Sequence, residues 1–346
     1  MTEKLEQNIL NSPLWYQIFI KYIVDSKMQP ALFMVDIEKK KLAAMFVQDV
    51  ESNTIHSMSN YYTPEYNFLD SCEQQSSLIN NHISLDIQSI KKTKYIQLVP
   101  LKDAQLKLFK SIFDSANFLC IPYRHSTNWY EPDIKSVDDY WNKRGSRLKN
   151  TIRRKKSKLL KNEQFKIVIP EMTNEKDFYK YLAQYHHVYL KSWKKNEPYP
   201  EFIDELYYQA WQREQLVFGF VYHNNCPIAS QAWILSSQKA HIYKLAHDPA
   251  YTKQSPGSIL TAELVNHVIL KHNINYIDFL TGDDKYKADW MSCKQQLWGL
   301  QCFNKKILTS SFKGYLRYYK NKCKALIISS PIYSNIFSFS SLGKRL

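Results

Sequence analysis

Two charged residues interrupt apolar stretches that have the pattern of β-strands. Lys244 lies within Ile242–Ala246, and Asp278 lies within Tyr276–Leu280. Because an isolated buried charge is costly, each side chain requires a polar partner or a cavity. We therefore expect Lys244 and Asp278 to meet across neighbouring strands and to line an active cleft. A structural ion pair, or a strand edge that exposes both charges, would leave the same pattern.

A polar loop follows the strand that contains Asp278. It includes Asp283, Tyr286 and Lys287, and Trp290 lies one helical turn further along the chain. Loops at the carboxyl ends of strands often hold ligands in α/β sheets. A phenol can protonate a leaving thiolate, so Tyr286 is a candidate general acid. A capped surface turn is the simpler alternative for this loop.

The segment Gln254–Ser258 connects a predicted strand to a predicted helix. Pro256 suits the first position of a helix, where its missing N–H is not needed. Gly257 allows the backbone to approach a ligand closely. A helix N-terminus offers free N–H groups and a partial positive charge, which suit a pyrophosphate. An ordinary loop before a helix is an equally good interpretation.

The sequence predicts no metal site. Its six cysteines are far apart and form no CxxC pair. The adjacent His186 and His187 would point about 100° apart on a helix, so they cannot easily hold one metal ion. Free thiols in a reducing compartment are the simpler interpretation of the cysteines.

Hydrophobic periodicity predicts the elements that position these residues. The second half has the order strand, two helices, a meander of three strands, a helix and a strand. These elements are expected at 165–170, 175–192, 200–214, 216–223, 227–235, 240–247, 256–272 and 276–280. In the first half we expect strands at 31–36, 42–48, 54–58, 95–100 and 117–122, and helices at 73–85 and 103–115. This mixture predicts an α+β (mixed α/β) fold.

Residues 136–161 give the clearest helical pattern. Ser136 and Asp139 have the spacing of a capping box. The apolar positions fall in one narrow stripe; they are Trp141, Leu148, Ile152 and Leu159. Between residues 143 and 161 there are ten Lys and Arg and no acidic residue. We expect this basic helix to connect the two halves of the chain.

The charge of the chain is concentrated in two segments. The 346 residues carry 47 Lys and Arg against 32 Asp and Glu, a net charge of +15. Residues 143–161 and 290–346 each hold ten cations and no acid, so the remainder has 27 basic and 32 acidic residues. This distribution favours two local contacts with anions, such as phosphates or an acidic membrane face.

Composition also excludes several classes of protein. No glycine occurs before Gly145, which excludes a Rossmann fingerprint or a P-loop in the first 144 residues. No apolar run is long enough to span a membrane, and Leu14–Val24 has the pattern of an amphipathic helix rather than a signal peptide. We expect a cytoplasmic protein.

Five segments taken together resemble a known family. They are SWKKNEPYP, IASQAW, IYKLAHDPAYTKQSPGSILTAELV, IDFLTGDDKYKADW and DYWNKRGSRLKNTIRRKKSKL. The first four resemble the GNAT-fold acetyltransferases associated with cellulose and exopolysaccharide biosynthesis, the CelD-like group, and the fifth resembles the bridging helix of that group. The similarity extends from about Val137 to Trp290 and is strongest over 240–290. The group is in turn similar to the Fem aminoacyl transferases, which contain two GNAT-like domains.

The resemblance implies two tandem GNAT-like domains joined by a long basic helix. A degenerate first domain would occupy 1–135, the basic helix 136–162, the acyltransferase domain 163–300 and a basic, Ser- and aromatic-rich tail 301–346. Strand 240–247 would hold the pantetheine arm of acetyl-CoA or another acyl-CoA. The residues implied for this co-substrate are Leu245, Ala246, Gln254, Ser255, Gly257 and Ser258. Ile259 is a departure, since the usual loop has a small residue there.

The implied reaction moves an acyl group from a thioester to an amine without a metal. Asp278 or Asp283 would take the proton of the amine, Tyr286 would protonate the thiolate, and Lys244 would complete the catalytic set. The side chains expected around the substrate are Trp193, Lys194, Lys287 and Trp290. The acceptor would be an amino sugar or another amine of cell-envelope or exopolysaccharide synthesis.

Two other functions fit the same residues. A Fem-like transferase would use aminoacyl-tRNA, and the basic helix would hold the tRNA. A non-catalytic adaptor would use the GNAT-like scaffold only to bind a membrane surface. The basic helix and the tail also suit a peripheral contact of an enzyme with the anionic inner face of a membrane.

Overall fold

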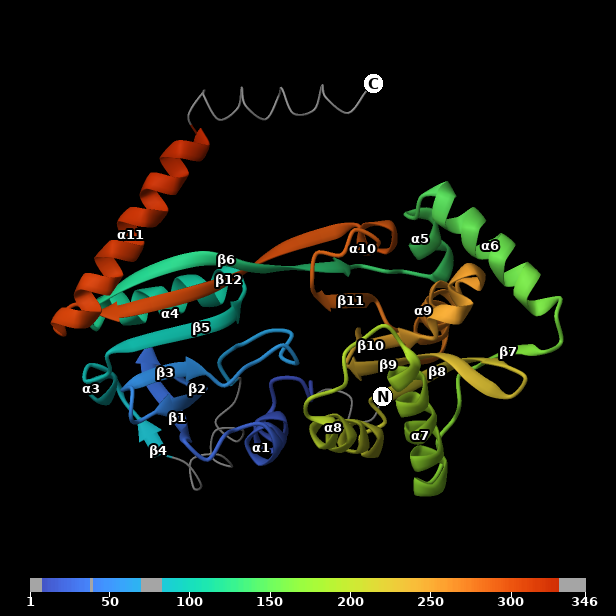
Figure 1. Cartoon of the computed structure of the whole chain (residues 1–346), viewed down its shortest axis with the longest axis horizontal. Coiled ribbons are helices and arrows are strands. Elements are labelled where there is room, and N and C mark those ends of the chain that lie inside the picture. The colour runs from blue at the N-terminus through green and yellow to red at the C-terminus, as the bar shows by residue number, and fades with distance from the viewer. Residues whose placement is uncertain (1–7, 38–39, 70–82, 330–346) are drawn as a thin grey trace.

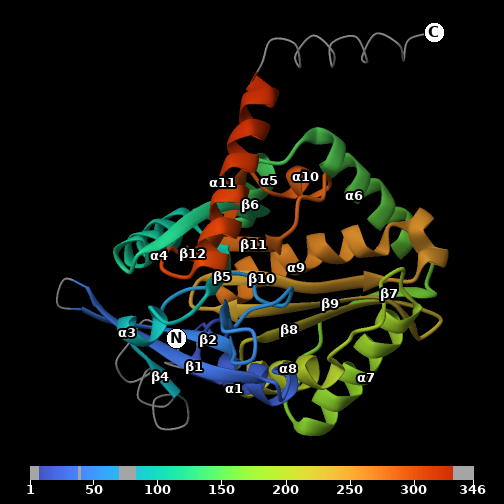
Figure 2. The ribbon, with the colours of Figure 1, turned by 60° about the vertical axis from the view of Figure 1, so that its left-hand side comes forward.

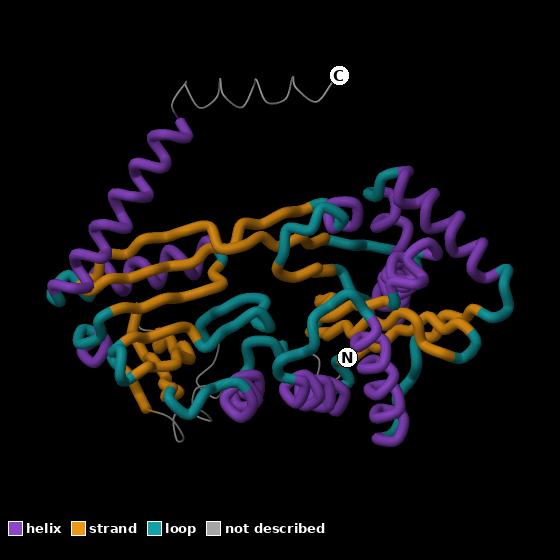
Figure 3. Tube along the Cα trace, in the orientation of Figure 1, coloured by secondary structure: helices purple, strands orange, loops and turns teal. Residues whose placement is uncertain are grey.

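One continuous sheet organises the chain (Figures 1 and 3). The computed structural model describes residues 8–37, 40–69 and 83–329. The sheet has 12 strands. Their spatial order is β4 (Ile83–Leu85), β1 (Met28–Ile37), β2 (Lys40–Asp49), β3 (Thr54–Ser57), β5 (Tyr95–Leu101), β12 (Cys293–Asn304), β6 (Phe118–Glu131), β11 (Tyr276–Thr281), β10 (Lys239–His247), β9 (Cys226–Ser236), β8 (Leu216–His223) and β7 (Phe165–Val168).

Helices cover both faces of the sheet in the second half of the chain. On one face lie α7 (Glu175–Lys191) and α8 (Pro200–Gln212), and on the other lies α9 (Pro256–His272). Strand β8 is buried on both faces, so it is almost entirely apolar: Phe218 packs toward α7 and α8, and Val217 packs toward α9.

The first half is built in the same way, with its own core. Helix α4 (Asp103–Ser115) covers the sheet, and α3 (Ile87–Ile90) precedes β5. Helix α1 (Pro13–Tyr22) lies beside α8 and joins the core of the second half, where the ring of Trp15 meets that of Phe202 at 5.2 Å. The two halves therefore share buried apolar surface as well as the sheet.

Both halves repeat one strand arrangement. In each, three antiparallel strands are followed by a parallel neighbour: β1, β2, β3 and then β5, and β8, β9, β10 and then β11. Strand β12 returns to the first half and pairs antiparallel with both β5 and β6. Since β6 also pairs with β11, one ladder connects the halves.

The basic stretch forms two helices rather than one. Helix α5 (Val137–Asn142) is capped by Ser136 as expected, and α6 (Ser146–Leu160) starts after a break at Gly145. Helix α6 packs against α9 and β7 at the end of the sheet, so it does not lie between the halves (Figure 2). Its apolar stripe is buried or half-buried against α9 and β7, most of its cations are exposed, and Lys156 forms an ion pair with Glu263 of α9.

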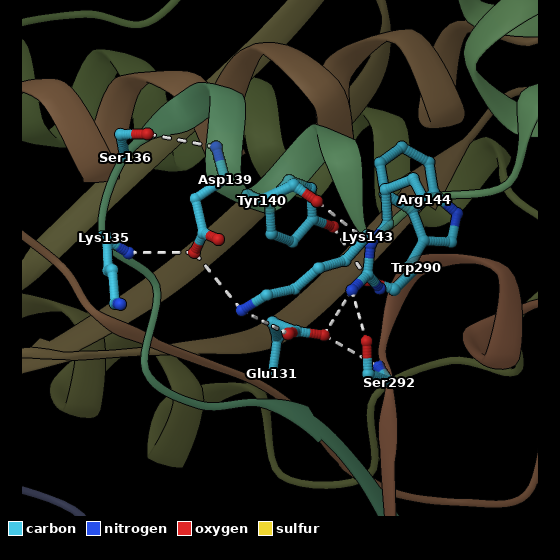
Figure 4. A network of polar contacts seen from close by, with 9 residues as sticks. All are labelled: Glu131, Lys135, Ser136, Asp139, Tyr140, Lys143, Arg144, Trp290 and Ser292. Atoms are coloured by element: carbon cyan, nitrogen blue, oxygen red, sulfur yellow. Dashed lines mark hydrogen bonds and ion pairs between the residues drawn. The ribbon is translucent and has the colours of Figure 1, made fainter.

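A buried ion pair fixes the break between these helices (Figure 4). The guanidinium of Arg144 bonds to the carboxylate of Glu131 and, at 2.6 Å, to Ser292 Oγ; both charged side chains are 2% exposed. Lys143 reaches the other carboxylate oxygen at 3.4 Å. Burial alone would raise the pKa of Glu131, but the bonds to Ser292 and the charge of Arg144 outweigh it and lower that pKa.

Most predicted elements of the sheet are confirmed, but the sequence missed three features. β12 was not predicted, and the expected domain boundary at 300 falls inside it. The expected helix at 73–85 ends in strand β4, and its residues 73–82 lie outside the described residues. The tail forms helix α11 (Leu308–Ser329), which projects away from the sheet (Figure 1).

Replacement of Arg144 by Gln should lower the free energy of unfolding by about 3 kcal/mol, because it leaves the Glu131 carboxylate buried without its main partner. Urea denaturation followed by circular dichroism measures this difference. Arg147→Gln, at the exposed second residue of α6, is the matched control and should change little. Equal midpoints for both variants would contradict a structural role for the pair.

Candidate active site

A cavity opens where β10 and β11 separate. The strands pair in parallel over only three residues, from Lys239 with Tyr276 to His241 with Asp278. Beyond this point β10 has an irregularity between Ile242 and Lys244, and β11 loses its register with β6 after Asp278. Such bulges bend strands and interrupt pairing. The two strands therefore diverge and leave space between them.

The space forms a cavity of about 410 Å³, which we call the splay cavity. Strands β10 and β11, the segment after α7, the 281–287 loop and the first half of the chain all contribute to it. Its lining is Tyr61, Tyr62, Pro64, Trp193, Lys194, Ile242, Tyr243, Lys244, Leu245, Phe279, Leu280, Thr281, Asp284, Tyr286 and Lys287. Five of the predicted site residues are among these, namely Trp193, Lys194, Lys244, Tyr286 and Lys287, together with the predicted co-substrate residue Leu245.

The corresponding gap in the first half is closed. Strands β3 and β5 also pair in parallel over three residues, from Thr54 to His56. Just beyond, the hydroxyls of Ser57 and Ser59 both donate to the carbonyl of Val99, and the N–H of Val99 donates to Ser57 Oγ. These bonds fill the position that the splay cavity has in the second half, which gives a physical reason for calling the first half degenerate.

Lys244 lies in the splay cavity, but its partner is not Asp278. Its ammonium is 2.8 Å from Glu197 Oε2, and the other oxygen of Glu197 accepts a hydrogen bond from the hydroxyl of Tyr62. The expected contact between Lys244 and Asp278 is therefore wrong. The two strands present these side chains to different cavities, because Asp278 precedes the point at which the strands diverge.

Lys194 adds a second cation to the cavity. Burial and, to a smaller extent, the like charge of Lys244 lower its pKa to about 8. Its ammonium lies 5.7 Å from the ring centre of Tyr189. The ring of Trp193, the preceding residue, has its centre 4.6 Å from that of His247 and is tilted by 54° to it. The segment after α7 thus places one cation and one exposed aromatic ring at the end of β10.

Lys287 has a structural task at the edge of the cavity. Its ammonium is buried and donates to the carbonyl oxygens of Phe279, Leu280, Thr281 and Gly282 at 3.1–3.5 Å. Leu280 and Gly282 both have positive φ, +59° and +129°, so β11 ends in an irregular backbone that needs these bonds. The amine is thus engaged by the protein itself.

Tyr286 is suited to donate a proton. Its side chain lines the splay cavity and meets the ring of Phe279 edge-on at 5.7 Å. Burial raises its pKa to about 12, so the phenol keeps its proton at neutral pH.

Two other predicted residues lie outside the cavity. Asp283 is exposed, accepts bonds from Lys294 and from the Trp129 indole, and has a lowered pKa through those bonds. Trp290 ends α10 (Lys287–Trp290), is buried against Trp141, and its carbonyl accepts a bond from Tyr140. Its position indicates packing of the core.

A second cavity of about 480 Å³ adjoins the first, and Pro64 and Leu280 line both. We call it the carboxylate cavity, because Asp278 lies in its wall. Burial raises the pKa of Asp278, although Leu280 N–H donates to Oδ1 at 2.7 Å and Asn128 Nδ2 to Oδ2 at 3.1 Å. His241, its cross-strand neighbour, lines the same cavity.

The predicted pyrophosphate loop lies at the far end of β10. Gln254 ends the short helix η2 (Pro249–Gln254), Ser255 adopts a left-handed conformation, and α9 begins at Pro256. A Cβ on Gly257 would meet only the ring of His247, at 3.5 Å. Packing within the protein therefore does not require a glycine at position 257. A ligand that approaches the backbone closely would require one.

The side chains around this loop are cationic. Lys155 and Lys158 of α6 line a cavity of about 380 Å³ together with Lys253 and Gln254, and no acidic residue lines it. Lys155 also donates to the carbonyl of Lys253. Ile259, the departure from the usual loop, belongs to α9, and its side chain is fully buried in the core. Of the other residues implied for the co-substrate, Ser258 is exposed and Ala246 is buried.

Sequence reasoning missed the contributions of the first half and of the α7–α8 connection. Tyr61, Tyr62 and Glu197 belong to the splay cavity or to its ion pair, and Asn128 and His241 belong to the carboxylate cavity. Only His241, a polar residue in an apolar strand, gave a local signal. The other four become visible once the two halves are assembled.

Comparisons with known proteins agree with this geometry. Residues 146–288 match the family model described as the acetyltransferase (GNAT) domain. This segment contains α6, the meander, the splay and the loop before α9. The chain therefore contains a GNAT-type domain in its second half. A search of curated proteins finds no match.

Solved structures of similar fold extend over both halves. FemX superimposes with a TM-score of 0.53 at 9% identity, over 85% of this chain and 92% of that one. The C-terminal domain of a putative lysylphosphatidylglycerol synthetase from Agrobacterium fabrum gives 0.51 at 10% identity, over 81% and 86%. A conserved protein of unknown function from Bacteroides thetaiotaomicron gives 0.53 at 10%, over 85% and 90%. At such identities the likeness concerns the fold.

Among the described residues, no three His, Cys, Asp or Glu side chains gather in a way that would hold a metal ion. Within the same residues, no helix has the length and hydropathy needed to cross a bilayer.

The lowered pKa of Lys194 should be visible in chemical labelling. Because the pKa is about 8, half of the Lys194 side chains are neutral at that pH, and the neutral amine is the reactive form. Acetic anhydride labelling at a series of pH values, read by mass spectrometry, should reach half-maximal rate at Lys194 near pH 8. A profile that coincides with that of the exposed neighbour Lys195 would contradict the burial of Lys194.

Proposed function

We propose that the protein is an N-acyltransferase that moves an acyl group from acyl-CoA to an amine. The observation that carries the proposal is the splay cavity, an opening between two parallel strands in the segment that matches the GNAT domain. Its lining combines an apolar wall, three lysines and the phenol of Tyr286. The finer assignment, to an acetyltransferase of the CelD-like group acting on an amino sugar or another envelope precursor, rests on the resemblance in sequence.

The path for acyl-CoA follows β10 from the splay cavity to the loop before α9. The thioester would lie beside Leu245 and Tyr286, and the pantetheine arm would pass the neighbouring rings of Trp193 and His247. The phosphates would reach Gly257, where free N–H groups of the α9 N-terminus are close to cations of α6. The basic helix thus provides charge at the position where an anionic co-substrate needs it.

The chemistry of transfer uses residues in both cavities. The amine nitrogen attacks the thioester carbonyl, and the carbonyl oxygen gains negative charge that the ammonium of Lys244 stabilises. As the C–S bond breaks, Tyr286 gives its proton to the thiolate. Asp278 accepts the proton that the amine loses, and its raised pKa suits it to hold that proton.

Transfer from aminoacyl-tRNA is the second candidate. FemX shares the fold over most of this chain, and α6 presents a row of exposed cations. A tRNA bound by several lysines would lose affinity steeply as salt rises. Calorimetry with acetyl-CoA and filter binding with tRNA at two salt concentrations separate the two candidates, and we expect acetyl-CoA to bind.

Removal of the Tyr286 hydroxyl should slow the reaction with little change in stability. We expect Tyr286→Phe to lower kcat by about 10²- to 10⁴-fold, the usual contribution of a general acid. Release of free CoA from acetyl-CoA, with glucosamine as acceptor, measures turnover. Tyr179→Phe, an exposed site on α7, is the control. Full activity of Tyr286→Phe would exclude the phenol as the general acid. If no acyl-CoA binds to the protein, the proposed function is excluded.

Helix α11 supports the proposed contact with an anionic membrane surface. Leu308, Phe312 and Leu316 follow each other at intervals of four and are 84%, 69% and 61% exposed. They form an apolar stripe on one face, and residues 305–322 add six exposed Lys and Arg without any acid. An apolar face flanked by cations is typical of helices that lie in a membrane interface.

Replacement of Leu308, Phe312 and Leu316 by Ser should therefore abolish binding to vesicles that contain 30% phosphatidylglycerol. The control replaces three apolar side chains that are equally exposed elsewhere, Tyr179, Leu190 and Leu270, by Ser. Sedimentation with vesicles measures binding, and vesicles of pure phosphatidylcholine should bind the wild type more weakly. Equal binding of the two triple variants would refute a role for α11.

A further inference from the structure

The carboxylate cavity contains buried hydrogen-bonding atoms that the protein leaves without partners. Asn128 Oδ1 and His241 Nδ1 both have no hydrogen-bond partner, and their residues are 5% and 7% exposed. A buried polar atom of this kind costs stability unless a ligand or water bonds to it. Both residues line the cavity next to Asp278, so three polar side chains converge on one space.

All three groups accept hydrogen bonds. The amide of Asn128 donates through Nδ2 to Asp278, which leaves its oxygen free to accept. His241 is neutral, since burial, with the nearby charges of Lys239 and Lys102, lowers its pKa to about 4. When Nε2–H donates to Ser236 Oγ, 3.3 Å away, Nδ1 is an acceptor. Each oxygen of Asp278 accepts one bond from the protein and keeps a second lone pair.

Three converging acceptors, one of them a carboxylate, fit a group that carries several donors and a positive charge. We propose that the carboxylate cavity binds the protonated primary amine of the acceptor substrate, with Asp278, Asn128 and His241 around its ammonium. The remaining lining includes Asn8, Asn11, Ser12 and Asn67, which suit a hydroxylated or otherwise polar carrier for that amine. It also contains two lysines, of which Lys102 is paired with Glu65 and Lys239 keeps its charge at the edge of the cavity.

The position of this site relative to the thioester supports the assignment. Pro64 and Leu280 line both cavities, so an amine bound beside Asp278 would lie next to the cavity that the thioester occupies. Leu280 also donates its N–H to Asp278, which links the wall between the cavities to the carboxylate. This inference rests on the proposed acyl transfer for its purpose, whereas the binding of an amine can be tested without any acyl donor.

Calorimetry of the full chain with glucosamine, ethanolamine and lysine, each paired with its N-acetylated form, tests the proposal. At least one amine should bind, and its N-acetylated form should bind at least tenfold more weakly, because acetylation removes the charge and two donors. Asp278→Asn should weaken binding of that amine by a similar factor. Asp289→Asn, the same change at an exposed position on α10, should have no effect.

The possible results lead to clear decisions. Binding of no amine, equal binding of an amine and its N-acetylated form, or unchanged binding in Asp278→Asn would each overturn the assignment. The comparison of ligands on the wild-type protein remains decisive even if Asp278→Asn fails to fold. If an amine binds but acyl-CoA does not, the proposed acyl transfer is refuted and the amine site is not. If the protein acetylates an amine whose binding does not depend on Asp278, the amine site is refuted and the acyl transfer is not.

Discussion

The return of β12 to the middle of the sheet is the constraint on which the rest of the structure depends. This strand comes after the GNAT-type segment, yet it pairs with β5 and, over twelve residues, with β6 of the first half. Strand β6 continues the ladder to β11. Because the two halves share one hydrogen-bonded sheet, cavities lined by both have fixed walls, and Tyr62 and Pro64 can be parts of a site built mainly by the second half.

Local backbone irregularity then decides which half has an open site. Each half has a parallel pair of only three residues, but serine hydroxyls close the first, whereas bulges in β10 and β11 open the second. The irregular end of β11 is stable because the ammonium of Lys287 satisfies its carbonyl groups. An internal cation thus maintains the shape of the cavity, Glu197 holds Lys244 in its wall, and Lys194 adds a further cation.

Sequence patterns predicted the parts of the molecule that depend on local periodicity. The helix over 256–272 and the strand over 216–223 are found at the predicted residues, and Lys244 and Tyr286 do line a cavity. The partner of Lys244 could not be predicted, because Glu197 approaches from a connection between helices that carries no strand or helix period. β12 could not be predicted, because its pairing joins residues that are far apart in the chain. Trp290 was predicted to contact the substrate, but a large aromatic side chain packs in a hydrophobic core equally well, and this one is buried there.

The distribution of charge gives the two cavities different chemistry although they share a wall. The splay cavity has cations and a phenol that keeps its proton, which suit an electron-rich thioester oxygen and a departing thiolate. The carboxylate cavity also contains Lys239 and the ion pair of Lys102 with Glu65, but beside Asp278 it offers acceptors and a carboxyl group of raised pKa, which suit an amine that must lose a proton. Lys244 is paired with Glu197 rather than with Asp278, so no cation of the splay cavity neutralises the carboxylate of Asp278. The separation of Lys244 and Asp278 by the diverging strands keeps an acid side and a base side for the same reaction.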